Sequence, residues 1–77
     1  MEATLFFAYA KFEGQEKFRL FSLKDNRTYF LKAHAPRYKI EQIERAKELA
    51  IKLVELNKQN NLHIKFIGIN NKTLWND

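Results

Sequence analysis

The sequence predicts an α+β fold, in which a small antiparallel sheet is covered on one face by a single amphipathic helix. Two observations support this class. Most of residues 4–34 falls into short, aromatic-rich segments of the kind that form strands. Residues 39–58 instead repeat their apolar side chains with the period of a helix. The expected order is therefore strand, strand, strand, helix, strand, with room for a short fifth strand at the end.

Turn residues separate the strands of the first half. Gly14 follows the first strand and can adopt a positive φ at the first position of a tight loop. Asp25 and Asn26 suit a two-residue loop, because both side chains tolerate the left-handed region of backbone conformation. Pro36 ends or bends the third strand, since proline cannot donate a ladder hydrogen bond. The expected strands are 4–12, 17–24 and 28–34.

The helix is expected over residues 39–58, with a wide apolar side opposite a charged side. On the charged side Glu41 precedes Arg45 and Glu48 precedes Lys52 by four residues, an order of charges that stabilises helices. The apolar side consists of Ile43, Ala46, Leu49, Ala50, Leu53 and Val54. A stop at Asn60 and Asn61, a strand at 63–69, a turn at 70–71 and a short strand at 72–75 complete the chain.

Composition limits the class of protein. The 77 residues are enough for one small domain, residues 1–77, and a content of 45% hydrophobic and 14% aromatic residues excludes a disordered chain. There is no cysteine, which excludes a disulfide framework, a thiolate metal site and a cysteine nucleophile. No apolar run is long enough to span a bilayer, and the first residues do not resemble a secretory signal. We therefore expect a cytoplasmic protein without membrane contact.

The net charge of +5 is concentrated in one segment. Between residues 17 and 39, seven basic residues face Asp25 as the one acidic residue. An excess of this size predicts an acidic partner, of which nucleic acid is the commonest kind. The alternative is a solvated strand surface that lysine keeps soluble.

The two tight loops also predict which side chains share a face of the sheet. Cross-strand partners lie on the same face, and their residue numbers should sum to 29 across the first loop and to 51 across the second. One face then collects Leu5, Phe7, Tyr9, Phe18, Leu20, Ser22, Tyr29, Leu31 and Ala33, and its apolar character places it under the helix. The other collects Phe6, Ala8, Ala10, Phe12, Lys17, Arg19, Phe21, Leu23, Phe30, Lys32 and His34.

This second face mixes aromatic and basic side chains, so we expect it to carry the function. Aromatic rings stack on bases while cations contact phosphates, which is the chemistry of single-strand binding surfaces. The same mixture suits an acidic protein surface, and a sheet-on-sheet homodimer is a further alternative. The candidate binding residues are Phe12, Lys17, Arg19, Phe21, Phe30, Lys32, His34 and Arg37.

Catalysis finds little support. The single serine, Ser22, falls on the face expected under the helix, and His34 and His63 lack a partner at a recognised spacing. No catalytic residue, metal or cofactor is therefore expected. A nuclease built on His34 with Arg19 and Lys32 is the remaining enzymatic alternative, because these three are expected on one face.

No motif identifies a family, but two resemblances of plan and composition stand out. The order of three strands and a helix over residues 4–58 resembles the arm-type DNA-binding domains of some integrases and plant AP2 domains, which lay a three-stranded sheet in the major groove. Their signature residues are absent, so no site is carried over. Size and a composition rich in Lys, Asn, Ile and Phe are similar to small phage or mobile-element inhibitors, anti-CRISPR proteins among them. That resemblance implies a host defence protein or another nucleic-acid-handling complex as the partner.

Overall fold

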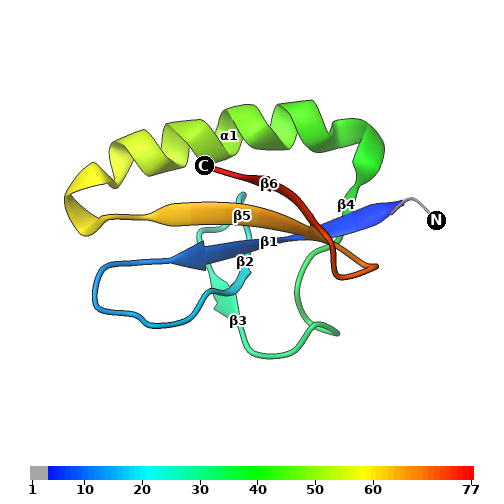
Figure 1. Ribbon diagram of the computed structural model, residues 1–77, viewed down its shortest axis with the longest axis horizontal. Coiled ribbons are helices and arrows are strands. Elements are labelled where there is room, and N and C mark those ends of the chain that lie inside the picture. Colours follow the sequence, from blue (N-terminus) through cyan, green and yellow to red (C-terminus); the bar gives the residue numbers. More distant parts are fainter. Residues whose placement is uncertain (1–3) are drawn as a thin grey trace.

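A computed structural model describes residues 4–77 and confirms the α+β class: an antiparallel sheet carries one helix along one of its faces (Figure 1). The strands are β1 (Leu5–Lys11), β2 (Arg19–Phe21), β3 (Thr28–Tyr29), β4 (Tyr38–Lys39), β5 (His63–Gly68) and β6 (Thr73–Asn76). Their order across the sheet is β3-β2-β1-β5-β6, and β4 pairs with the start of β1. The short strand expected at the end of the chain is thus confirmed as β6.

The helix is shorter than the 39–58 expected from its apolar period. A 3₁₀ turn over Ile40–Gln42 leads into α1 (Ile43–Leu56), and a second 3₁₀ turn covers Lys58–Asn60. The helix ends at Asn57, whose side-chain amide donates to the Leu53 carbonyl at 2.8 Å. Among the described residues its one ion pair joins Glu44 to Lys47 at 3.2 Å, rather than the two pairs expected at a spacing of four.

The first loop has the expected register and the second does not. Across the first, Ala8 pairs with Phe21, and Gly14 adopts the expected positive φ of 86°. Across the second, Leu20 pairs with Tyr29, so the partner numbers sum to 49 and the loop is longer by two residues. Ser22 closes it, because its hydroxyl accepts the Asp25 N–H at 3.3 Å.

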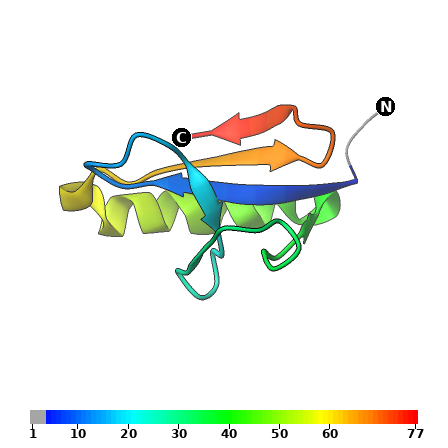
Figure 2. The same ribbon diagram turned by 90° about the horizontal axis from the view of Figure 1, so that it is seen from below.

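The third strand predicted over 28–34 is wrong beyond Tyr29. Residues 30–37 form a loop that turns back beneath the sheet, where Ala35 packs against Phe7 and Leu20 (Figure 2). The chain must make this return because β4 pairs with Leu5 and Phe6 of β1, whereas β3 lies two strands away from β1.

The face that lies under the helix is the opposite of the one expected. The main core joins the buried helix residues to the even-numbered side chains of β1, and its buried members are Phe6, Ala8, Ala10, Phe21, Leu23, Ala46, Ala50, Leu53, Leu62, Ile64 and Phe66. Strand β5 explains this choice. Its Ile64 and Phe66 pair with Ala10 and Ala8, whereas Lys65 falls on the other face opposite Tyr9. An unpaired lysine under a helix would be too costly to bury.

Aromatic contacts extend this core across the sheet. The Phe66 ring centroid lies 4.9 Å from that of Phe6 and 4.9 Å from that of Trp75. Tyr38 of β4 stacks on Phe6 at 5.4 Å, and its hydroxyl accepts the Leu23 N–H at 3.0 Å. Within residues 4–77, no helix is both long and apolar enough to cross a membrane.

Candidate functional site

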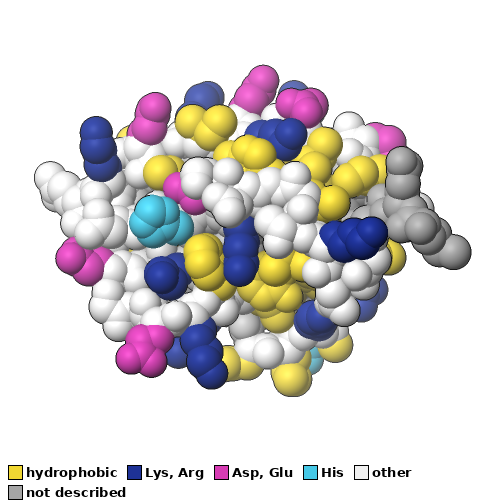
Figure 3. All heavy atoms as spheres, in the orientation of Figure 1, with side chains coloured by type: hydrophobic (Ala, Val, Ile, Leu, Met, Phe, Trp, Pro, Cys, Tyr) yellow, Lys and Arg dark blue, Asp and Glu magenta, His cyan; other side chains and the backbone are white. Residues whose placement is uncertain are grey.

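The face of the sheet turned away from α1 combines aromatic and basic side chains; we call it the open face. It consists of Tyr9, Lys11, Phe18, Tyr29, Lys65 and Ile67, with Arg19, Phe30 and Lys32 at its rim. Figure 2 looks onto it, with the helix behind the strands. In the lower half of Figure 3, dark blue Lys and Arg side chains lie among yellow hydrophobic ones. The acidic side chains visible in that view are found mainly along the helix and at the left edge.

Cations sit directly over aromatic rings on this side of the molecule. The Lys65 Nζ lies 4.2 Å from the centroid of the Phe18 ring, and the Lys11 Nζ lies 5.5 Å from it. The Arg19 guanidinium lies 5.5 Å from the centroid of Phe30. Cation–π contacts of this kind form within about 6 Å of a ring centroid. Basic groups and ring faces are therefore available at the same positions.

A shallow hollow of about 480 Å³ lies between β1, β2 and β3 on the open face. Its lining contains several cations and no carboxylate: Tyr9, Lys17, Phe18, Arg19, Leu20, Tyr29, Phe30 and Lys32. Burial raises the pKa of the Tyr9 hydroxyl above its usual value, so this group stays a neutral hydrogen-bond donor at physiological pH. The hollow thus offers ring faces, positive charge and one neutral donor.

The structure brings together half of the residues predicted for the site. Lys17, Arg19, Phe30 and Lys32 all line the hollow. The other four lie elsewhere: Phe12 packs half-buried against the main core, Phe21 is buried within it, and His34 and Arg37 are exposed in the 30–37 loop. The prediction of Phe21 as a surface residue is wrong because the helix covers its face.

Sequence reasoning missed Tyr9, Phe18 and Lys65 as members of the open face. It placed Tyr9 and Phe18 under the helix and left the fourth strand out of the comparison of faces. The signal was present in residues 63–66, where His63 and Lys65 alternate with apolar residues. Once β5 pairs with β1, this alternation marks the face that the helix cannot cover.

The described residues offer few groups for chemistry. The Ser22 hydroxyl is buried in its loop, 3.4 Å from a carboxylate oxygen of Asp25. His63 Nδ1 lies 3.5 Å from a carboxylate oxygen of Asp77. No three His, Asp or Glu side chains between residues 4 and 77 gather closely enough to hold a metal ion. The groups that the open face presents are ring faces and ammonium and guanidinium cations.

The chain matches no protein-family model, no curated protein and no solved structure. Its function has to be inferred from the chemistry of this surface.

Proposed function

We propose that the protein is a non-enzymatic module that binds single-stranded nucleic acid on its open face. The observation that supports this most is the arrangement around Phe18, whose ring lies beneath two lysine ammonium groups. When a strand binds, these ammonium groups can move to the phosphates and leave the ring free for a base. Stacking platforms next to cations are the common design of surfaces that bind single strands.

The distribution of charge favours a polyanion over a neutral partner. The open face carries Lys11 and Lys65, and its rim adds Lys17, Arg19 and Lys32. The glutamates of α1 belong to the helix that covers the opposite face of the sheet, so they do not oppose a phosphate chain on the open face. Phosphate contacts supply most of the affinity of such complexes and make it depend on salt.

An unpaired strand fits the open face better than a duplex. Stacking requires access to the flat faces of the bases, which only unpaired nucleotides provide. Phe30 supports the same conclusion, because this residue is 86% exposed at the rim of the hollow, where a base can reach its ring. A duplex of the same sequence is therefore a control that should bind more weakly.

Fluorescence anisotropy with labelled single strands of DNA and RNA tests the proposal. Strands of about 12 nucleotides match the site sizes of known single-strand binders. Phe18→Ala should cost about 1–3 kcal/mol for each base that stacks on it and leave the salt slope unchanged. Lys65→Ala should reduce the salt slope by about one unit. Lys52→Ala is the matched control, since Lys52 is equally basic but belongs to α1, which covers the opposite face of the sheet.

Two results would overturn the proposal. One is the absence of binding tighter than about 100 µM at low salt, which even non-specific binders usually reach. The other is equal weakening by Lys52→Ala and Lys65→Ala, which would indicate attraction to net charge alone. In either case the competing proposals gain: an inhibitor that occupies a nucleic-acid-handling protein, or a homodimer formed through the open face. A dimer in sedimentation equilibrium that Phe18→Glu dissociates would identify the latter.

A further inference from the structure

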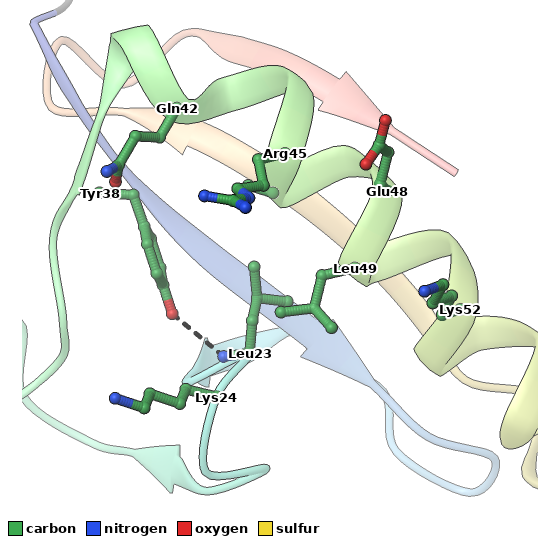
Figure 4. A pocket seen from close by; sticks show the side chains of 9 residues that line it. Leu23, Lys24, Tyr38, Gln42, Arg45, Glu48, Leu49 and Lys52 are labelled. Carbon is green, nitrogen blue, oxygen red and sulfur yellow. Dashed lines mark hydrogen bonds between the residues drawn. The ribbon is translucent and has the colours of Figure 1, made fainter.

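A second surface feature lies on the helix side of the molecule, apart from the open face. It is a groove of about 400 Å³ between α1, β4 and the loop that follows β2 (Figure 4). Its lining residues are Leu23, Lys24, Tyr38, Gln42, Arg45, Ala46, Glu48, Leu49 and Lys52. We call it the helix groove.

The floor of the helix groove is apolar. Leu23 is only 3% exposed and lies opposite Leu49, which is 40% exposed although it belongs to the apolar side of the helix. The Tyr38 ring closes one end, held by the hydrogen bond that its hydroxyl accepts from the Leu23 N–H. The groove exists because β2 is three residues long and β4 two, so the sheet does not reach Leu49.

The rim of the helix groove is basic. Lys24, Arg45 and Lys52 border it, and Glu48 is the one acidic residue in its lining. Figure 4 shows the Glu48 carboxylate pointing away from Leu23 and Leu49. The two ion pairs recorded for residues 4–77 involve none of these three cations. The groove therefore combines apolar contact area with three cations against one carboxylate.

The spacing of the cations indicates the form of the ligand. Arg45 and Lys52 are seven residues apart on α1, which corresponds to about 10 Å along the helix axis. That separation is too large for one carboxylate to bridge, but acidic side chains along an extended peptide can reach both, since each residue advances by about 3.3 Å.

From these observations we infer that the helix groove binds an extended acidic peptide segment of a partner protein, with one large apolar side chain inserted between Leu23 and Leu49. This is charge complementarity around an apolar anchor, the arrangement that gives protein interfaces their few energetically dominant residues. The inference goes beyond nucleic-acid binding and does not depend on it, because the two surfaces share none of their lining residues.

The test uses the 77-residue chain and a fluorescein-labelled peptide, Glu-Asp-Glu-Phe-Asp-Glu, in an anisotropy titration. We expect saturable binding that weakens at least about fivefold with Arg45→Gln and about tenfold with Leu49→Asp, the scale of single dominant interface residues. Leu49 is partly exposed on a helix, so its replacement should leave the fold intact, which circular dichroism checks. Lys65→Ala on the open face is the matched control and should not change the affinity.

Four results would overturn this inference. Two concern the peptide itself: an absence of saturable binding, or equal binding when its phenylalanine is replaced by serine, which excludes the apolar anchor. If decanoate displaces the labelled peptide at concentrations equal to those of the peptide, the ligand is a small amphipathic acid and not a peptide. Amide chemical shifts that move at Phe18 and Lys65 instead of Leu23 and Leu49 would place the peptide on the open face.

Discussion

Replacing Phe21 by alanine tests which face of the sheet the helix covers, and with it the position of the open face. Phe21 is 2% exposed and belongs to the core between sheet and helix. Truncation of a buried phenylalanine to alanine typically costs about 3–5 kcal/mol. For a domain of 77 residues, the free energy of unfolding is expected to be about 4–12 kcal/mol. Phe21→Ala should therefore remove at least a quarter of the stability, and in the extreme case all of it.

Phe18 provides the matched comparison. It has the same side chain, lies three residues earlier, and is half-buried under the lysines of the open face. Because the site is already partly in water, Phe18→Ala should cost less than about 1.5 kcal/mol, below the range for full burial. The two variants thus separate a core residue from a surface residue without changing the chemistry of the substitution.

Urea denaturation followed by tryptophan fluorescence measures both variants. Trp75 is the single tryptophan and packs against Phe66 in the same core, so its emission reports on the contact between helix and sheet. With an m-value of about 1 kcal/mol/M, the low end for small proteins, Phe21→Ala should lower the midpoint by about 3 M or leave the protein unfolded. A larger loss for Phe18→Ala than for Phe21→Ala would refute the assignment of the faces.

Three further predictions concern single residues. Tyr38→Phe removes the acceptor of the buried Leu23 N–H and should cost about 1–3 kcal/mol in thermal denaturation, whereas an unchanged melting temperature would show that this bond contributes nothing. Burial raises the pKa of Tyr38 above its usual 10.0, so the folded state keeps this proton longer than the unfolded state does. The contribution of this raised pKa to the free energy of unfolding should be complete below about pH 10 and lost as the pH rises through the higher pKa of the folded state. Urea midpoints measured at several alkaline pH values should therefore fall less in Tyr38→Phe than in the unsubstituted protein. Gly14→Ala should cost about 1–2 kcal/mol because φ there is 86°, and a stabilising effect would contradict the strained conformation.

Local sequence patterns determined the positions of most secondary elements. The aromatic-rich composition of residues 4–12, the helical period after Ile40 and the conformational freedom of Gly14 act over a few residues, so the sequence reveals them directly. The register of the first hairpin followed from the same turn. The third strand could not be predicted in the same way. Its residues have strand propensity, but the chain must return to β1 to form β4, and this constraint comes from the topology.

For the candidate site, the sequence by itself singled out Lys17, Arg19, Phe30 and Lys32, which line the hollow, but assigned the basic and aromatic character to the face that the helix covers. Only the tertiary structure decided which face this is. The decision depends on the pairing of Ala8 with Phe66 and of Tyr9 with Lys65, more than 50 residues apart in the chain. The two faces of β1 have nearly equal apolar character. The helix therefore covers the face on which no charge would be buried. That preference arises only when β5 lies beside β1, because the lysine that excludes the helix from the open face comes from the distant strand.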